Sequence, residues 1–406
     1  MASIVKRGSS YRITVSNGRD AQGKQLLETA TFTPDPKRTE KQNQKALQEF
    51  ALDFERKVKS GKYLDGEKIL FSEFVEKWFA EYAEPHLQPT TVANYQDLYR
   101  VHVRPALGQL KLARIQPFQL NTLYNTMLKE RKDGKAGGYS ANTIKRVHAF
   151  ISSVMETAVK WNVITENPCE RVSTPKQERD TSDIHFFTQE ETLVFLDAVD
   201  AQLAAGNIQL QHKVMFHLAL YCGIRRGELV ALEWSDFDFE QNTVSISKNT
   251  VIVKGKPLTK IPKNKSSVRI ISVPDDVMQL IKKYKTEQQR YRLSLGSYWQ
   301  GNNYVFIQHN GRQMYPSTPY NTIKRVIRKY NEGLSADEQP LSDITFHDTR
   351  HTSATLLISG NMDVRTVSNR LGHAQTSTTM NIYSHALKKK DQAAADTLSN
   401  MLKRNA

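Results

Sequence analysis

The stretch "STPKQERDTSDIH", residues 173–185, limits what this chain can fold into more than any other feature. It shows neither the 3.6-residue spacing of a helix nor the alternation of a strand, and polar and charged residues dominate it. Patterned sequence lies on both sides, so the stretch reads as a linker between separately folded parts. At 406 residues the chain is also long for one hydrophobic core, and we expect two or three domains.

Residues 1–66 predict a small sheet with one supporting helix. "SSYRITVS" alternates polar and apolar residues as a strand does, the turn signal "NGRDAQGK" follows, and "QLLETATF" completes a hairpin. "TEKQNQKALQEFALDFERKVKSG" then has the pattern of an amphipathic helix that ends at Gly61. Residues 1–24 hold five basic side chains and one acidic side chain. A basic sheet can enter a DNA groove, with Arg12 as our candidate contact, but a solvated edge sheet explains the segment equally well.

Residues 67–172 predict four helices. In residues 71–84 the apolar positions follow one helical stripe, and they are Phe71, Phe74, Val75, Trp78, Phe79 and Tyr82. Three more helices are expected in residues 89–108, 117–131 and 140–164. Ser140 caps the last of them, which carries Lys145 and Arg146 near its start. Four amphipathic helices make a compact bundle, and these two basic residues are candidate DNA contacts.

Residues 186–406 predict the largest unit, mainly helical with a small antiparallel sheet. Its first helix opens with a capping box from Thr188 to Glu191, and "HKVMFHLALYC" is apolar nearly all round, which predicts a buried helix. "TVSISK" and "SVRIISVP" read as strands with a lysine-rich stretch between them. We therefore expect a multidomain α+β protein with domains 1–66, 67–172 and 186–406 and a linker at 173–185.

The composition limits the partners. The chain has 57 Lys and Arg against 42 Asp and Glu, a formal charge of +15 and a pI near 9.5, which favours nucleic acid over a membrane. No apolar run approaches the ~18–20 residues that span a bilayer, and the N-terminus lacks the apolar segment of a secretory signal. The two cysteines, Cys169 and Cys222, do not suggest a disulfide framework. These features favour a reducing cytoplasm.

The third domain holds an arginine pair suited to phosphate chemistry. Covalent cleavage of a phosphodiester needs a nucleophile, cations for the oxyanion and a proton donor for the leaving alkoxide. "CGIRRGELVALEW" places Arg225 and Arg226 directly after the buried helix, with Gly223 to let the chain turn. The planar guanidinium suits two phosphate oxygens at once. A surface pair at a helix start explains the segment about equally well, with Arg226 the bystander.

Two histidines and another arginine follow. "FHDTRHTSATLLISG" carries His347 and Arg350 three residues apart, on one face of a helix whose apolar residues anchor it to a core. An imidazole there can exchange a proton with the nucleophile while the guanidinium holds the oxyanion. A partly buried polar cluster is the alternative. His373 follows a glycine that can end a helix; it can donate to a phosphate oxygen, although a structural histidine is the commoner case.

Tyr383 stands in "LGHAQTSTTMNIYSH", among serines and threonines rather than core residues. The phenol has an ordinary pKa of about 10, but arginines and a phosphate beside it favour the phenolate. We interpret Tyr383 as a nucleophile. From Lys248 to Arg269 there are seven basic residues and no acidic one. Most of them fit phosphate or solvent contact, and one close before "SVRIISVP" can protonate the leaving oxygen.

No cofactor is expected. These groups are not accompanied by zinc-spaced Cys and His, an H-E-x-x-H motif or an acidic triad, so we expect no metal. A phosphotyrosine link keeps the bond energy for resealing, so we expect no ATP. "GRDAQGKQ" matches part of a P-loop, but Gln25 stands where Ser or Thr should bind magnesium and a strand follows, so we read a hairpin turn.

Together, "GIRRGEL", "HDTRHT", "LGH" and "YSH" resemble the ordered catalytic set of the tyrosine recombinases. Each motif alone is weak, whereas four in order are specific. The similarity covers the whole third domain. Residues 67–172 resemble the core-DNA-binding domain of the family, and residues 1–66 resemble the arm-DNA-binding domain of phage and conjugative-transposon integrases. With all three domains present, the chain looks most like a conjugative-transposon integrase.

The resemblance implies that Tyr383 is the nucleophile and forms a 3′-phosphotyrosine, with Arg225 and Arg350 clamping the scissile phosphate. The implied activity is site-specific strand exchange that integrates and excises a mobile element such as a conjugative transposon or a prophage. A type IB topoisomerase performs the same chemistry without synapsis, but the arm-type domain and the C-terminal helix that we expect in residues 391–406 argue against it. A catalytically silent DNA-binding regulator is the third alternative.

The resemblance also implies that His347 serves in proton transfer and that His373 contacts the same phosphate. It makes Lys263 the general acid, with Lys265 the alternative because hairpin lengths vary in the family. The implied partners are double-stranded DNA at core and arm sites, three further copies of the chain in a tetramer joined by the C-terminal helix, and an excisionase or a host DNA-bending protein. The expected location is the bacterial cytoplasm, at the nucleoid.

Overall fold

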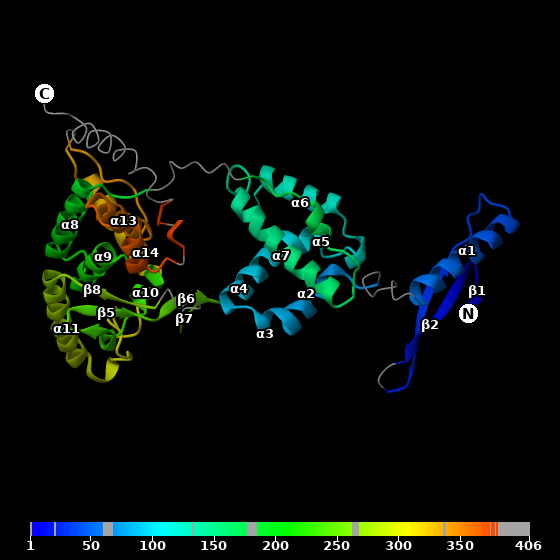
Figure 1. Ribbon diagram of the computed structural model, residues 1–406, viewed down its shortest axis with the longest axis horizontal. Helices are drawn as coiled ribbons and strands as arrows, with labels where there is room; N and C mark the ends of the chain where they lie inside the picture. Colours follow the sequence, from blue (N-terminus) through cyan, green and yellow to red (C-terminus); the bar gives the residue numbers. More distant parts are fainter. Residues whose placement is uncertain are drawn as a thin grey trace, which may run out of the picture. The chain divides into compact units, whose positions relative to one another are not determined.

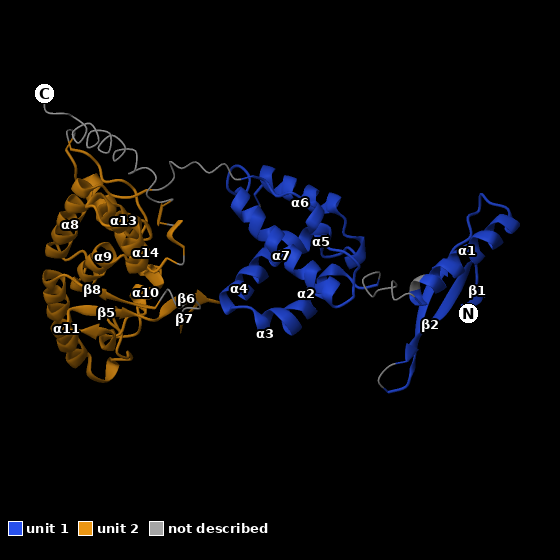
Figure 2. Ribbon diagram, viewed as in Figure 1, with its two compact units in different colours: residues 1–178 blue, residues 179–406 orange. Residues whose placement is uncertain are grey.

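The computed structural model falls into two compact units, residues 1–178 and 179–406 (Figure 2), which are described separately here. It describes residues 2–19, 22–59, 68–131, 134–176, 185–261, 268–335, 338–373, 375–377 and 379–380. Small antiparallel sheets and many helices make up both units (Figure 1), as the predicted α+β class requires. The division at residue 178 falls inside the stretch expected to be a linker.

The N-terminal part of unit 1 is a three-stranded sheet with one helix against it. The elements are β1 (Ser3–Arg7), β2 (Ser10–Arg19), β3 (Gln25–Phe32) and α1 (Glu40–Lys59), and the antiparallel strand order is β1-β2-β3. Ile13 and Val15 of β2 pack against Leu47 and Phe54 of α1 in a small core. The predicted hairpin is confirmed. β1 was missed because all its residues are exposed, so no alternation marks it. The helix end expected at Gly61 lies outside the described residues.

The rest of unit 1 is helical, as predicted. Its longer helices are α2 (Phe71–Trp78), α4 (Pro89–Leu98), α6 (Pro117–Lys129) and α7 (Ala141–Lys160). Wider π-helical turns (Phe79–Ala83 and Tyr99–Val103) and the short helices α3 (Glu84–His86) and α5 (Arg104–Leu107) continue α2 and α4. Ser140 caps α7, since its hydroxyl accepts from the amide of Thr143 at 3.3 Å. The indole of buried Trp78 donates to Thr157 of α7 at 2.9 Å, which joins α2 to α7.

Unit 2 is built around α9 (Leu210–Cys222), the helix predicted to be buried. The helices packed on it are α8 (Gln189–Ala204), α11 (Asp275–Leu295), α12 (Thr318–Glu332) and α13 (Asp348–Ser359). Figure 1 labels α8, α9, α11 and α13. The predicted capping box of α8 is present: Thr188 accepts from the amide of Glu191 at 3.2 Å, and Glu191 accepts from the amide of Thr188 at 2.8 Å. Two short helices, α10 (Arg226–Val230) and α14 (Val364–Leu371), respectively follow Arg225 directly and precede His373, two of the candidate catalytic residues.

The strands of unit 2 form two separate sheets. β4 (Phe237–Asp238), β5 (Thr243–Ile246) and β8 (Arg269–Ser272) make one, and β6 (Asn249–Val253) and β7 (Lys256–Lys260) make the other. The pairing of β5 with β8 agrees with the two predicted strands. The lysine-rich stretch between them, to which the residues alone assigned no structure, contains the β6–β7 hairpin. Lys254 and Gly255 both have positive φ, 48° and 78°, which suits a tight hairpin turn.

Among the described residues, no helix combines the length and the apolar character that crossing a bilayer requires. Cys169 and Cys222 are both buried and not disulfide-bonded.

Candidate active site

Arg225 is held at the start of α10 by the carboxylate of Glu228. Its Nη1 donates to Glu228 Oε1 at 2.8 Å, and its backbone amide donates to Glu228 Oε2 at 3.1 Å. Gly223 makes this possible, because it ends α9 with φ of 58°, a left-handed conformation that favours glycine. The side chain of Arg225 keeps 32 % of its surface exposed. Its guanidinium is thus oriented by the protein but still accessible to a ligand.

Glu228 also binds a second arginine. Arg269 of β8 donates from Nη2 to Glu228 Oε2 at 2.8 Å and from Nη1 to Oε1 at 3.3 Å, and both side chains are largely buried. Burial alone would raise the pKa of Glu228, but the hydrogen bonds and charges of Arg269 and Arg225 outweigh it and lower the pKa. One buried carboxylate thus lies between two guanidinium groups, so this cluster keeps a net positive charge.

The end of α14 brings His373 next to Arg225. Gly372 has φ of 66° and ends α14, as the sequence predicted, and its carbonyl oxygen accepts from Arg225 Nη2 at 2.9 Å. The next residue is His373, whose Nδ1 lies 2.7 Å from the hydroxyl of Thr379. Burial, and then the charges of Arg350 and Arg225, lower the pKa of His373 to about 3. The imidazole is therefore neutral at pH 7.

Arg350 is the most buried cation of the site, with 2 % of its surface exposed. Its Nη1 donates to the carbonyl oxygen of Gly223 at 2.7 Å, whereas its buried Nη2 has no acceptor within the described part of the chain. Burial and the neighbouring Arg225 and Arg269 lower the pKa of Arg350 to about 9, which leaves it charged at neutral pH. A buried donor without a partner is costly, so this atom is poised for a ligand acceptor.

His347 precedes the first turn of α13 and lies three residues before Arg350. Its side chain is exposed, yet desolvation by the surrounding protein and, next, the positive charge of Arg350 lower its pKa. Its ring lies 5.1 Å from that of His351, centre to centre. Asp348 accepts from the amide of Thr345 at 2.7 Å and lies 4.0 Å from His351 Nε2, which supports this turn.

The predicted anchoring of α13 is confirmed, since Ala354 and Ile358 pack against Val367 and Leu371 of α14.

A surface cavity of about 680 Å³ joins the start of α10, strand β6 and the turn before α13. It is lined by Arg225, Arg226, Gly227, Asn249, Thr250, Val251, Ile252, Pro316, Tyr320, Thr345, Phe346 and His347. Arg226 is exposed on its edge, as expected for a residue that holds no part of the cluster. The cavity gives a polyanion access to Arg225 and His347 from outside.

Of the six residues predicted from the motifs, the structure brings four together: Arg225, His347, Arg350 and His373. Lys263, its alternative Lys265 and Tyr383 lie outside the described residues. Lys248 is engaged in ion pairs with Glu233 at 2.8 Å and Asp236 at 3.4 Å, so it is a poor proton donor for DNA.

Two members of the cluster were missed. Glu228 stands three residues after Arg225, at the position where an acid caps the first turn of a helix, and that spacing could have revealed it. Arg269 was counted among the basic residues expected to contact phosphate or solvent, but it is buried on Glu228. Among the described residues, no three His, Cys, Asp or Glu side chains gather in a way that could hold a metal ion.

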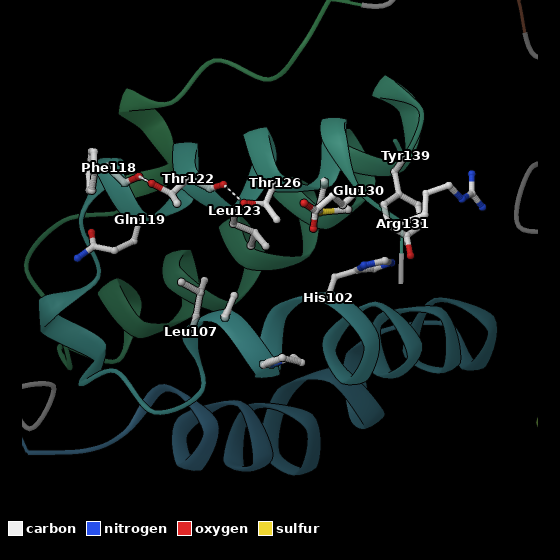
Figure 3. A pocket seen from close by; sticks show the side chains of 13 residues that line it. His102, Leu107, Phe118, Gln119, Thr122, Leu123, Thr126, Glu130, Arg131 and Tyr139 are labelled. Atoms are coloured by element: carbon white, nitrogen blue, oxygen red, sulfur yellow. Dashed lines mark hydrogen bonds between the residues drawn. The ribbon is translucent and has the colours of Figure 1, made fainter. Parts of the chain in front are cut away.

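The helical part of unit 1 contains a different kind of cavity (Figure 3). It measures about 340 Å³ and is lined largely by apolar side chains such as Leu107, Phe118 and Leu123. The guanidinium of Arg131 lies over the ring of Tyr139, 4.8 Å from its centre, so its charge is engaged in a cation–π interaction. This cavity offers no paired cations and is not the candidate active site.

The candidate DNA contacts of unit 1 are all exposed. Arg12 alternates along β2 with the core residues Ile13 and Val15, so it lies on the face of the sheet that α1 does not cover. Lys145 and Arg146 lie near the start of α7, and Arg146 Nη2 donates to Asn94 Oδ1 of α4.

The family follows from comparison with known proteins. Residues 185–390 match the phage integrase family, and residues 70–128 match the phage integrase N-terminal SAM-like domain. The chain belongs to the phage integrase family. It is a tyrosine-type site-specific recombinase, an enzyme of the recombination of mobile elements, as the motifs predicted.

Relatives of this recombinase match it along nearly its whole length. It is 27 % identical to a tyrosine recombinase XerC-like protein of Caldanaerobacter subterraneus subsp. tengcongensis, covering 98 % of each chain. It is 24 % identical to the ICEBs1 integrase of Bacillus subtilis, covering 97 % of each chain.

Solved structures share the fold. The Tn1549 transposon integrase, solved in complex with a circular intermediate DNA, superposes with a TM-score of 0.63 at 20 % identity, covering 82 % of this chain and all of that one. A lambda integrase dimer bound to a COC′ core site gives 0.56 at 17 % identity, covering 93 % of each chain.

Proposed function

We propose that this recombinase cuts and rejoins DNA through Tyr383. The phenolic oxygen attacks the scissile phosphorus and forms a 3′-phosphotyrosine, while the bond to the 5′-oxygen breaks. Lys263 gives its proton to that oxygen, which leaves as a 5′-hydroxyl, with Lys265 as the alternative donor. The 5′-hydroxyl of another strand then attacks the phosphotyrosine, the proton returns and Tyr383 is released. No external energy source enters, because one phosphoester is exchanged for another.

The observation that carries this proposal is the closeness of two arginines: Arg225 lines the surface cavity, and the buried Arg350 is hydrogen-bonded to Gly223, two residues before it. The transition state of phosphoryl transfer bears negative charge on its non-bridging oxygens, and preorganised cations stabilise it without reorganisation. Arg350 Nη2 is buried and has no acceptor in the described part of the chain, and Arg225 is partly exposed beside it. Both guanidinium groups are oriented by the protein before any DNA arrives, which supports a phosphate clamp.

The two histidines take different parts in this scheme. A neutral His347 can accept the proton of Tyr383 as the nucleophile attacks, and its lowered pKa supports a neutral ring. The Thr379 hydroxyl can donate to His373 Nδ1, which then leaves Nε2 protonated and able to donate to a phosphate oxygen. His373 therefore acts as a neutral donor, not as an acid.

We assign DNA binding to three surfaces. The catalytic cavity takes the scissile phosphate, Lys145 and Arg146 contact the core site, and the outer face of the N-terminal sheet contacts an arm site through Arg12. Val5 and Thr31, which lie across from Arg12 in the neighbouring strands, bear no negative charge. The net charge of +15 supports contact with phosphates in general.

We infer that four copies assemble on DNA in the bacterial cytoplasm and that residues 391–406 join neighbouring copies. Deleting them should weaken synapsis more than binding to a single site, and unchanged tetramer formation in native gels would refute this. The similarity to integrases of a transposon and of ICEBs1 favours a conjugative element over a prophage as the carrier. An excisionase or a host DNA-bending protein is the partner we expect for directionality.

A nicked suicide duplex from the end of the element tests the mechanism. The wild-type protein should form an adduct that survives denaturation, and Tyr383→Phe should not. An adduct in Tyr383→Phe would place the nucleophile elsewhere. Tight binding without an adduct in either protein would favour the silent regulator, and relaxation of supercoiled DNA that lacks the site would favour a topoisomerase.

A further inference from the structure

The side chain of Gln313 lies where three segments of unit 2 meet. Its Nε2 is 2.7 Å from Thr250 Oγ1 of β6, 2.9 Å from the carbonyl oxygen of Val230 at the end of α10, and 3.3 Å from Thr259 Oγ1 of β7. Thr250 and Thr259 face each other in the hairpin, and their hydroxyls are 2.7 Å apart. One amide group thus links the catalytic helix α10 to both strands of the β6–β7 hairpin.

The chemistry of these partners fixes the orientation of the amide. The carbonyl of Val230 can only accept, so the NH₂ end of Gln313 must face it. The two shorter contacts use the two amide hydrogens, and one hydroxyl hydrogen lies between Thr250 and Thr259. Thr250 is buried, with 2 % of its surface exposed. Removal of the amide takes a donor away from the Thr250 hydroxyl oxygen and from the Val230 carbonyl oxygen, a cost that a shift of the hairpin can relieve.

The hairpin is seated directly on the helix that carries Arg225. A Cβ atom at Gly227 would come within 2.1 Å of Asn249 Oδ1 and 2.7 Å of the Thr250 carbonyl oxygen, so no side chain fits between them. Residues Asn249 to Ile252 also form a wall of the cavity that Arg225 and His347 line. The root of the hairpin, Asn249 and Thr250 of β6 with Thr259 and Lys260 of β7, therefore lies beside the phosphate site.

The same root sets where the chain leaves the hairpin. Asn249 pairs with Lys260, so the last residue of β7 lies beside the residue that touches Gly227. Lys263 follows three residues later, and three extended residues reach at most ~10–11 Å. We therefore expect a displaced root to move the point at which the segment carrying this lysine begins.

We propose that Gln313 is a positioning residue for the proton-donating step: it fixes the β6–β7 hairpin to α10 and so aims the general acid at the leaving oxygen. The inference rests on the proposed assignment of that acid to the segment after β7. Gln313 itself does not touch the reacting atoms. Its effect is on the breaking of the bond to the 5′-oxygen, not on the binding of the phosphate.

A change of leaving group tests this directly. A suicide duplex with sulfur in place of the 5′-bridging oxygen expels a thiolate, whose conjugate thiol has a pKa of about 8.5, so the step no longer depends on an acid. We expect Gln313→Ala to cleave the ordinary duplex on the order of 10- to 100-fold more slowly, because a misplaced general acid loses only part of the roughly 10²- to 10⁴-fold that such an acid contributes. On the sulfur duplex it should cleave at nearly the wild-type rate.

Matched variants separate positioning from loss of structure. Thr250→Val removes the hydroxyl at constant shape and should behave like Gln313→Ala, whereas Thr250→Ser keeps the hydroxyl and should behave like wild type on both duplexes. Gln279→Ala, at an exposed position of α11, should cleave both duplexes at the wild-type rate. Arg225→Lys should be slow on both duplexes, because the clamp serves either leaving group. The Thr250 pair keeps the test decisive if Gln313→Ala does not fold.

The outcomes distinguish this proposal from the assignment of Lys263. Equal slowing of Gln313→Ala on both duplexes, or no slowing on either, would overturn the role of Gln313. Lys263→Met should show the same sulfur rescue. If Gln313→Ala is rescued and Lys263→Met is not, the positioning role stands and the acid is another group beyond β7. If only Lys263→Met is rescued, the acid stands and the role of Gln313 is wrong.

Discussion

Arg350 donates a hydrogen bond from Nη1 to the carbonyl oxygen of Gly223 at 2.7 Å, across a sequence separation of 127 residues. This bond aims the buried guanidinium at the turn that leads to Arg225. The carbonyl can point there only because Gly223 is left-handed, with φ of 58°. One backbone conformation therefore sets the spacing between the two arginines that we propose as the phosphate clamp.

We expect Gly223→Ala to lose both stability and cleavage. A side chain at positive φ costs about 1–2 kcal/mol, and here its Cβ would also lie 2.2 Å from Leu371 Cδ2. Overpacking of this kind typically costs about 1–3 kcal/mol more. Urea unfolding should show the combined loss. Gly206→Ala is the control, because Gly206 has φ of 71° with open space around it and should show only the backbone cost. Equal losses in the two variants would contradict the packing argument.

Glu228→Gln should slow cleavage more than it weakens DNA binding. The amide keeps the shape of the carboxylate but loses the charge that holds Arg225 and Arg269 together, and such charge-assisted bonds are roughly twice as strong as neutral ones. We expect about a 10²-fold loss in single-turnover cleavage, as for other misplaced catalytic groups. Binding titrations of the same duplex should change little. A variant that binds weakly but cleaves normally once bound would refute this role.

His351 should make the protein sensitive to mild acid. Burial, then the charges of His347 and Arg350, lower its pKa from 6.5 to about 4 in the folded protein. As the pH falls, His351 of the unfolded chain is protonated before His351 of the folded protein. The contribution of His351 to the free energy of unfolding is therefore fully present above pH 6.5 and is lost as the pH falls towards 4. Urea unfolding at pH 7.5 and pH 5.0 should show a larger acid loss for wild type than for His351→Gln. The same loss in both proteins would show that His351 is not responsible.

Arg12→Ala should weaken arm-site binding and its salt dependence. If Arg12 neutralises one phosphate, the slope of log K against log salt should fall by about 0.9. Titration at several salt concentrations measures this slope. Lys45→Ala removes the same charge from an exposed position on α1 and should leave the slope unchanged. Equal slopes for the two variants would remove the sheet face from the DNA interface.

The sequence predicted the elements that carry a strong pattern. The stripe from Phe71 to Tyr82, the all-apolar helix ending at Cys222 and the capping box at Thr188 are each a local signal, and each is in the structure. The strands β1, β6 and β7 were not assigned from the residues, because these are largely exposed or lysine-rich and their pairing leaves no periodic pattern in the sequence.

The site divides in the same way. Motifs identified Arg225, His347, Arg350 and His373, because these side chains suit phosphate chemistry and their order resembles that of the tyrosine recombinases. Glu228 was overlooked because an acid next to a phosphate site appears unfavourable until its two arginine partners are known. The contacts of Arg269 and Gln313 depend on segments far apart in the chain, so no spacing in the sequence announces them.

Strand β5 pairs directly with β8, and Ile246 lies opposite Arg269. The chain thus leaves this sheet and returns to it at adjacent points, with the whole β6–β7 hairpin in between. The hairpin is therefore an insertion between two strands that already pair with each other, and the sheet of β4, β5 and β8 forms without it. A recombinase with a longer, shorter or exchanged hairpin could keep the same core, which makes this segment a natural place to graft the leaving-group chemistry of one integrase onto the scaffold of another.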